Sequence, residues 1–418
     1  MPDPPRQRPS RRRFLQMAGG TALLGASSAC AGGASASAPA PAGASETPSD
    51  FADRSDPWLE IDRAAFQHNV REASKLSGGG PVLAVCKNDG YGLGDGTVGP
   101  ILAEMPEVAG LACVRVEEAL ALRAVGVTKP ILVMAECSDE EMVALIRHSV
   151  TPSVWNNDAL ARIESLAARF GHPIPVQLFI DTGMNREGMP SYRARPWMEA
   201  LAASPAVEID GTYTMFSHDL DFDRVQLERF EELLGWAREQ RLPLGTLHAS
   251  PTVELFHLPD GHYDMVRPGN ALFGHYPSGD GVRDQAELKP VFRLKARVVR
   301  VERLEVGESA GFYRTYEPDH ATWVALLPVG RTDGYPSSAN GRGEVLIGGR
   351  LYPVVGGVNS AHAIIDVGPE RTVEVGDTVT LIGPDDPAIH PEEVSARTET
   401  SNLRLIQGMN PRLPRRVV

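Results

Sequence analysis

A lysine at the end of a strand-like apolar run is the residue with the clearest chemical potential in this sequence. Lys87 directly follows the run 81–86. Burying an ammonium group costs free energy, so such a position lowers the pKa of the amine and makes it a usable nucleophile. The glycine-rich segment 88–96 comes next and allows a backbone to approach a ligand closely. The alternative interpretation is a solvent-facing lysine just past a strand.

The segment 88–96 does not have the spacing of a nucleotide-binding loop. Thr97 stands where the third glycine of a GxGxxG motif would be, and the lysine spacing of a P-loop is missing as well. A dinucleotide site and a P-loop site are therefore disfavoured. The sequence also has no CxxC, HxxxH or HExxH motif, so we expect no metal site.

Apolar runs alternate with amphipathic stretches between about residues 57 and 287. The runs, which we expect to be strands, lie at 82–86, 108–114, 130–134, 150–154, 176–180, 209–216, 246–249 and near 271–274. The stretches, which we expect to be helices, lie at 64–77, 116–125, 139–148, 158–170, 195–203 and 223–239. This alternation predicts a parallel (β/α)8 TIM-type barrel over 57–287, with a doubly wound open sheet as the structural alternative. Barrel enzymes place their chemistry at the C-terminal ends of the strands, where Lys87 would lie.

After about residue 288 the pattern changes to β-branched runs separated by Gly, Pro and Asp turns. These runs lie at 292–303, 321–328, 343–355, 363–367 and 378–382. They predict a C-terminal antiparallel β domain over 288–400, which is a normal domain size. We expect the basic, Pro-containing tail 401–418 to pack on the surface.

The composition is that of a soluble globular protein with an acidic surface. The 418 residues are 42% apolar and 23% charged, which excludes a mostly disordered chain. The formal net charge is −13, so DNA and RNA are not expected as partners. Four cysteines are too few and too unevenly spaced for a disulfide framework.

The first 50 residues read as an export signal followed by a linker. Three arginines at 11–13 and the pair Phe14-Leu15 precede a short apolar stretch, in a pattern that resembles a twin-arginine signal. An Ala/Gly/Ser/Pro-rich segment follows. We therefore expect export to the periplasm or cell envelope, with Cys30 as a candidate site of lipid anchoring.

Five ordered motifs resemble those of the alanine racemase family. The segment LAVCKNDGYGLG (83–94) resembles the pyridoxal-phosphate lysine motif of this family. The other four are 59–69, DTGMNREGM at 181–189, MVRPGNALFG at 265–274 and LPVGRTDGYP at 327–336. The resemblance covers about residues 57–385 and implies a barrel followed by a β domain, active as a head-to-tail homodimer.

The resemblance also implies a cofactor and its contacts. Pyridoxal phosphate would be held as a Schiff base on Lys87, and Arg186 would help to bind the carboxylate of an amino-acid substrate. The other implied cofactor contacts are Tyr91 and Thr252 at the phosphate with the backbone of Gly269 and Asn270, His218 beside the ring, and Arg267 at the pyridine nitrogen. A guanidinium does not give up its proton, so Arg267 would leave that nitrogen unprotonated.

The sequence departs from the family on the substrate side. In the segment 308–316, Phe312 occupies the place of the tyrosine that serves as the second base in the family. A phenyl ring has no exchangeable proton, so the adjacent Tyr313 is the candidate catalytic residue if a bulge shifts the strand register. Ser360 replaces a residue whose backbone helps to bind the substrate carboxylate. Arg331 and Phe179 also stand at changed positions.

These features predict an exported, pyridoxal-phosphate-dependent amino-acid racemase that interconverts L- and D-amino acids. The first alternative is a one-face enzyme of the same cofactor, such as a decarboxylase, an aldolase-type lyase or a transaminase, and Phe312 favours it. The second alternative, from another class, is a non-catalytic cofactor-binding envelope protein.

Overall fold

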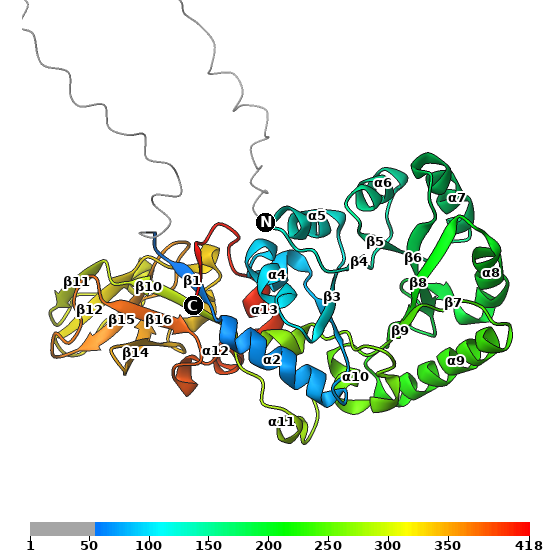
Figure 1. The fold of residues 1–418 in the computed structure, drawn as a ribbon. Coiled ribbons are helices and arrows are strands. Elements are labelled where there is room, and N and C mark those ends of the chain that lie inside the picture. Colours follow the sequence, from blue (N-terminus) through cyan, green and yellow to red (C-terminus); the bar gives the residue numbers. More distant parts are fainter. Residues whose placement is uncertain (1–54) are drawn as a thin grey trace, which may run out of the picture. The chain divides into compact units, whose positions relative to one another are not determined.

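The computed structural model describes residues 55–418, and Figure 1 shows their fold. The predicted export signal and Cys30 lie outside the described residues. Within 55–418, no helix combines the length and the apolar character needed to span a membrane.

Seven parallel strands form most of a barrel and follow one another in chain order. They are β2 (Val82–Val85), β3 (Val108–Cys113), β4 (Ile131–Val133), β5 (Thr151–Val154), β6 (Ile174–Asp181), β8 (Val207–Thr214) and β9 (Thr246–His248); a two-residue strand, β7 (Met189–Pro190), pairs with β6. The chain is buried along nearly all of these strands, as parallel sheets covered by helices require.

The barrel closes through Met265 and Val266. Met265 forms a parallel bridge with His248 of β9, and Val266 forms one with Val82 of β2. The parallel (β/α)8 barrel is thus confirmed, and closure excludes the open-sheet alternative. The prediction of the last strand near 271–274 is wrong, because these residues form a short 3-10 helix, η3 (Asn270–Phe273), that ends at the left-handed Gly274.

Helices cover the outside of the barrel; six of the longer ones lie at the predicted places, and one, over 95–103, lies where no helix was predicted. The longer ones are α2 (Arg63–Leu76), α4 (Asp95–Ala103), α5 (Val116–Ala124), α6 (Asp139–Arg147), α7 (Ala159–Phe170), α8 (Ser191–Ala203) and α9 (Leu220–Glu239). Short polar side chains start several of them: the Asp62 carboxylate accepts from the Ala65 N–H at 2.9 Å, and Ser138 begins α6 with a capping box. Left-handed Gly171 ends α7.

A second, mostly antiparallel sheet follows the barrel, as predicted. Its strand order is β11-β12-β15-β14-β13-β16-β10-β1-β17. The strands from the predicted β domain are β10 (Phe292–Arg297), β11 (Arg300–Leu304), β12 (Thr322–Leu327), β13 (Glu344–Ile347), β14 (Arg350–Val355), β15 (Ala363–Gly368) and β16 (Thr378–Ile382). The predicted run 343–355 is a hairpin, because Gly348 and Gly349 adopt positive φ and turn the chain.

Both ends of the described chain also enter this second sheet. The first strand, β1 (Trp58–Ile61), pairs antiparallel with β10 and parallel with β17 (Arg415–Val417). The sequence pattern predicts 57–61 as part of the barrel and 401–418 as a surface tail, whereas both contribute a strand to the second sheet. Hydrophobic pattern shows that a strand is buried but not which sheet receives it, and this is the reason for the difference.

Candidate active site

Lys87 lies at the carboxyl end of β2, where the strand passes into the short helix α3 (Asn88–Tyr91). It is half-buried. Burial is the main cause that lowers the pKa of the Lys87 amine, and the cations Arg186 and Arg267 lower it further, against the opposing effect of Glu118. A larger share of this amine is therefore unprotonated near neutral pH than for an exposed lysine.

The loop after Lys87 is held from two sides. Buried Glu118 accepts the Asn88 N–H at 2.6 Å and the N–H groups of Val114 and Arg115, both at 3.0 Å. From β17, the Arg415 guanidinium donates to the carbonyl oxygens of Leu93 at 2.7 Å and Gly92 at 2.9 Å. The C-terminal strand thus fixes the glycine-rich segment that follows Lys87.

Arg267 is almost completely buried beside the barrel axis, next to His248. Its guanidinium contacts the His248 Nδ1 at 2.5 Å and donates to the carbonyl oxygens of Thr214 at 2.9 Å and Ala249 at 3.3 Å. Burial lowers the pKa of Arg267 to about 10, so the group remains charged at neutral pH. Burial and Arg267 together hold the pKa of His248 well below its ordinary range, and its Nε2–H donates to the Gln177 Oε1 at 2.8 Å.

A stack of aromatic rings lies beside Arg267. Phe179 stacks on Tyr213 with ring centroids 4.5 Å apart, and Tyr213 stacks on His248 at 4.8 Å. The Arg267 guanidinium lies 5.0 Å from the centroid of the Tyr213 ring. The residue at position 179, one of the departures noted in the sequence, therefore contributes an apolar ring to the core of the barrel.

Tyr91, Thr252 and Gly269 meet near the end of the barrel that carries Lys87. A Cβ atom on Gly269 would lie 2.2 Å from the Tyr91 hydroxyl oxygen, so the backbone and the phenol approach as only glycine allows. The Thr252 Oγ1 accepts the N–H groups of Gly269 at 3.3 Å and Ala271 at 3.1 Å. Asn270 begins η3 in the same segment.

These residues fit pyridoxal phosphate. The structure supplies an amine with a lowered pKa at Lys87, a buried cation at Arg267, and the hydroxyls of Tyr91 and Thr252, which are groups of the kind that a phosphate requires. The close approach of Gly269 to the Tyr91 hydroxyl is the most specific observation, because it brings a phenol hydroxyl and a backbone segment together at one point.

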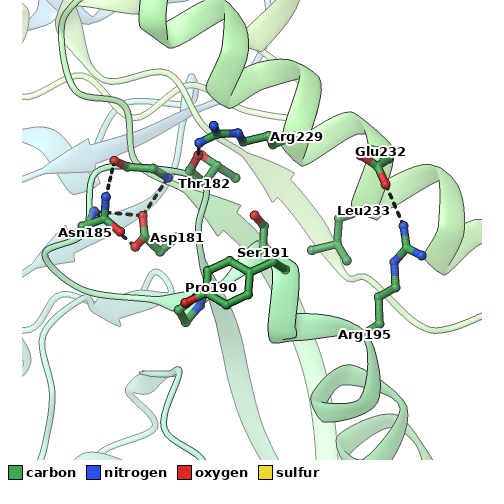
Figure 2. A pocket seen from close by; sticks show the side chains of 11 residues that line it. Asp181, Thr182, Asn185, Pro190, Ser191, Arg195, Arg229, Glu232 and Leu233 are labelled. Atoms are coloured by element: carbon green, nitrogen blue, oxygen red, sulfur yellow. Dashed lines mark hydrogen bonds and ion pairs between the residues drawn. The ribbon is translucent and has the colours of Figure 1, made fainter.

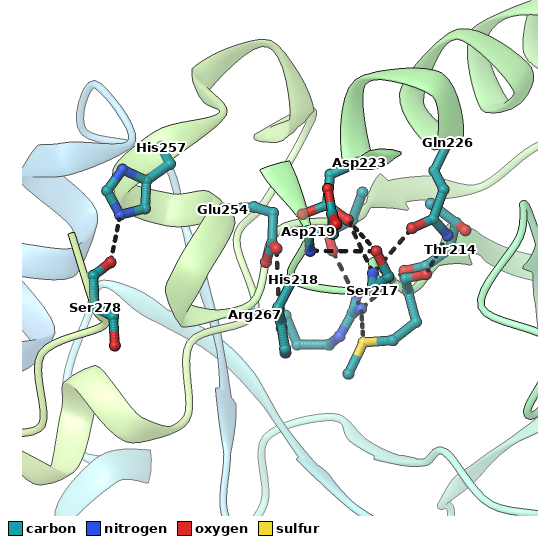
Figure 3. Close-up of polar contacts among 12 residues, drawn as sticks. Thr214, Ser217, His218, Asp219, Asp223, Gln226, Glu254, His257, Arg267 and Ser278 are labelled. Carbon is teal, nitrogen blue, oxygen red and sulfur yellow. Dashed lines mark hydrogen bonds and ion pairs between the residues drawn. The ribbon is translucent and has the colours of Figure 1, made fainter. Parts of the chain in front are cut away.

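His218, whose side chain is 44% exposed, contacts a network of buried polar groups that Figure 3 shows. Its Nδ1 lies 2.9 Å from the Glu254 Oε1, and this hydrogen bond is the main cause that raises the pKa of His218. Glu254, in α10 (Thr252–His257), is completely buried, and so is Asp223 of α9. The sequence analysis did not single out either acid. Glu254 could have been noticed in the sequence, because it is an acid among the apolar residues of the segment TVELF (252–256).

Arg186 lies on the loop between β6 and β7. The Asp181 carboxylate shapes this loop by accepting the N–H groups of Gly183 at 2.9 Å and Asn185 at 3.1 Å. The Arg186 side chain is 56% exposed, and its nearest ion pair is with Glu187 at 3.6 Å. A cleft of about 640 Å³ lies beside the loop and is lined by Asn185 and Ser191 among others (Figure 2), but Lys87 and Arg267 do not line it.

Tyr313 and Ser360 lie on exposed loops of the second sheet. Residues 312–314 form a single 3-10 turn, η4 (Phe312–Arg314), between the bridged residues Ala310 and Tyr316. Alternation along a strand therefore does not apply here: Tyr313 is 98% exposed and Phe312 is 72% exposed. The Ser360 hydroxyl accepts from the Arg331 guanidinium at 3.2 Å. The structure thus brings Ser360 to Arg331, not to Lys87.

Family models match both parts of the chain. The model described as alanine racemase, N-terminal domain, matches residues 61–277, and the model described as alanine racemase, C-terminal domain, matches residues 291–417. Among curated relatives, the alanine racemase of Desulforamulus reducens is 32% identical over 86% of this chain and 98% of its own length. That of Carboxydothermus hydrogenoformans is 30% identical over 86% and 98%.

Solved structures show the same similarity. An alanine racemase from Clostridium difficile 630 superimposes with a TM-score of 0.80 at 25% identity, covering 87% of this chain and 96% of that one. The alanine racemase from a D-cycloserine-producing Streptomyces lavendulae superimposes with a TM-score of 0.78 at 26% identity, covering 89% and 98%. The chain belongs to the alanine racemase family, whose enzymes are isomerases that use pyridoxal phosphate.

Proposed function

We propose that this protein is an amino-acid racemase that interconverts L- and D-enantiomers with pyridoxal phosphate bound at Lys87. The observation that carries the proposal is the half-buried Lys87 amine at the end of β2, with its pKa lowered by burial and by the cations Arg186 and Arg267. Alanine is the first substrate to test, because the relatives are named for it.

The barrel residues have separate tasks in this proposal. Lys87 would hold the cofactor, Arg267 would face its ring nitrogen, and Arg186 would bind the substrate carboxylate with paired hydrogen bonds. The residues that hold the phosphate are Tyr91, Thr252, Gly269 and Asn270. Pyridoxal phosphate, when bound, withdraws electrons from the α-carbon of the amino acid and weakens its C–H bond. The unprotonated Lys87 Nζ can then accept the α-proton on one face.

Racemisation also needs a proton donor on the opposite face of the α-carbon. The Tyr313 phenol is presented to solvent on the second sheet. A second copy of the chain would bring the partner subunit's Tyr313 to the barrel, and we therefore propose that the active form is a homodimer. Ser360, next to Arg331 on a neighbouring loop, would contribute to substrate binding from the same side.

One observation favours a second candidate function. Phe312 occupies the place of the catalytic tyrosine, and its ring cannot exchange a proton. If Tyr313 does not replace that tyrosine, Lys87 alone moves protons, and the enzyme acts on one face of its substrate, as a decarboxylase, aldolase-type lyase or transaminase does.

Proton exchange in heavy water separates these functions. Purified protein loaded with pyridoxal phosphate is incubated with single enantiomers of alanine and of other amino acids. We expect α-deuterium in both enantiomers, and no exchange in Lys87→Ala, which should lose more than about 10⁴-fold of the rate. Deuteration with retained configuration would establish one-face chemistry instead. Cofactor absorbance without any exchange would indicate the non-catalytic cofactor-binding protein, and absence of both would exclude a function that depends on pyridoxal phosphate.

We also propose that the protein is exported. The arginines at 11–13 with Phe14 and Leu15 support a twin-arginine route, and Cys30 is the candidate anchor. Replacing Arg11 and Arg12 together with lysine should retain the protein in the cytoplasm on fractionation. Cys30→Ser should release an anchored protein from the membrane fraction, and an unchanged distribution would argue for a free periplasmic protein.

A further inference from the structure

Glu254 is a completely buried acid at the end of the barrel that carries the proposed site. It lies two residues after Thr252 on the short helix α10, and its Oε1 contacts the His218 Nδ1 at 2.9 Å. Its second oxygen, Oε2, is buried and has no hydrogen-bond partner within residues 55–418. A buried carboxylate oxygen without a donor is costly, so this arrangement requires an explanation.

Asp223, on α9, also has one buried carboxylate oxygen without a donor among the described residues. Its Oδ1 accepts the Ser217 N–H at 2.9 Å and the Ser217 hydroxyl at 2.8 Å, whereas its Oδ2 is buried without a donor in the described part of the chain. Burial first, and then Glu254, raise the pKa of Asp223 to about 6. Two adjacent buried carboxyl groups that each lack one donor can satisfy both oxygens by sharing a proton.

The third member of the network, His218, is fixed in an uncommon backbone conformation. Its φ is +67°, a left-handed value that a non-glycine residue keeps only where its surroundings hold it. The charged groups that face its ring are Glu254 from α10, Asp223 from α9 and Arg186 from the loop after β6. When the two acids share a proton, the pair keeps one negative charge. The direct contact of Nδ1 with Glu254 outweighs the opposing effect of Arg186, so this environment favours the positively charged ring.

We propose that Glu254, supported by Asp223, is a positioning residue that holds His218 as an imidazolium with Nδ1–H directed at the Glu254 carboxylate. The Nε2–H then remains as a charged donor for an anionic oxygen of the ligand in the barrel. The inference rests on the proposed function in one respect, because that function places pyridoxal phosphate in the barrel and the family resemblance implies that its ring lies beside His218. The site would hold His218 as a third cation, in addition to Arg186 and Arg267.

The protonation of His218 can be measured without cofactor or substrate. The apoprotein is labelled with ¹⁵N-histidine, His218→Asn assigns the signal, and the ring is titrated by NMR. In the wild type we expect His218 to be charged at a pH at which an ordinary histidine is mostly neutral. Glu254→Gln keeps the shape but removes the charge, and should lower the midpoint by about one pH unit or more. Glu254→Asp should restore part of the difference.

Two further variants complete this experiment. Glu232→Gln is the matched control, because Glu232 pairs with Arg195 on the outside of the barrel at 2.8 Å and should leave His218 unchanged. Asp223→Asn should lower the midpoint less than Glu254→Gln does. If Glu254→Gln does not fold, the wild-type titration still decides, since a midpoint at or below that of an ordinary histidine would overturn the proposal.

A kinetic experiment on the loaded enzyme tests the role toward the ligand. With His218 charged, kcat/KM should fall as pH rises through the raised pKa of His218, and Glu254→Gln should move that limb to lower pH with a KM about 10-fold higher. If Glu254→Gln shows the expected NMR shift but an unchanged pH profile of kcat/KM, the contact of His218 with the ligand is overturned and its positioning by Glu254 is not. If neither the wild type nor any variant racemises an amino acid, the proposed function fails. The NMR titration then still decides whether Glu254 holds His218 in its charged form.

Discussion

The end of the barrel that carries Lys87 and the loops of the second sheet differ in how completely one chain builds them. At the barrel, Arg267 is 1% exposed and contacts His248, Thr214 and Ala249. On the second sheet, Tyr313 is 98% exposed. The cofactor side of the proposed site is therefore organised within one subunit, whereas the substrate side depends on what the exposed loops meet.

Three of the departures from the family lie on the loop side, whereas a fourth, Phe179, lies in the core of the barrel. Phe312, Arg331 and Ser360 lie on the exposed loops, whereas Lys87, Arg267 and the segment around Gly269 keep the family pattern. An exposed loop residue can change at little cost to folding, because it has few packed neighbours. Substitutions at the barrel should thus lower stability and cofactor binding, and substitutions on the loops should lower turnover alone.

The largest effect expected from a substitution on the loop side comes from the Tyr313 hydroxyl. Tyr313→Phe removes one hydroxyl and should lower racemisation by about 10²- to 10⁴-fold, because a general acid–base group is lost. The midpoint of urea unfolding should not change, since the ring is exposed. Phe312→Leu is the matched control and should retain most of the activity. A normal rate in Tyr313→Phe would remove this residue from the mechanism and favour one-face chemistry.

The second effect tests the barrel side. Arg267→Met leaves the His248 Nδ1 and two buried carbonyl oxygens without their donor, so we expect the free energy of unfolding of the apoprotein to fall by about 3 kcal/mol. Arg186→Met, which removes a half-exposed cation, should cost less than about 1 kcal/mol. Urea unfolding of both apoproteins measures this difference, and equal losses would contradict the division between a rigid barrel and its loops.

Much of this division could be predicted from the sequence because it depends on unusual residues in local patterns. A lysine at the end of an apolar run stands out against its neighbours, and Lys87 lies at the end of β2 as the pattern predicted. The role of Arg267 came from the family resemblance of MVRPGN and stays a prediction. The position of the last barrel strand was not predictable in this way. Only two residues, Met265 and Val266, close the barrel, and no periodicity can appear over so short a segment.

What the sequence could not provide is contact between distant segments. Glu254 and His218 are 36 residues apart, and Glu254 and Asp223 are 31 apart, so their network exists only because α9 and α10 pack on the same part of the barrel. At Tyr313 the prediction was limited by the local backbone conformation and not by distant contacts. The expectation of a strand with a bulge assumes that neighbouring side chains point to opposite faces, and this does not hold for residues 312–314, which form a 3-10 helix.

The smallest expected effect concerns Gly269, the glycine of the barrel that lies against Tyr91. In Gly269→Ala the new Cβ would lie 2.2 Å from the Tyr91 hydroxyl oxygen, and the phenol must move to make room. Because Gly269 has a negative φ, this contact and not backbone strain sets the cost, which we expect to be about 1 to 2 kcal/mol of unfolding free energy. The affinity for pyridoxal phosphate should fall by roughly 10-fold.

Gly235→Ala provides the matched control for this substitution. Gly235 lies inside α9 with no atom within 4 Å of the added Cβ, so alanine there should stabilise the protein by up to about 1 kcal/mol. Thermal unfolding and cofactor titration of the two variants compare a glycine needed for close approach with one that is not. If both glycines tolerate alanine equally and the cofactor affinity does not change, Tyr91 and Gly269 do not form the phosphate site, and the assignment of that part of the barrel must be revised.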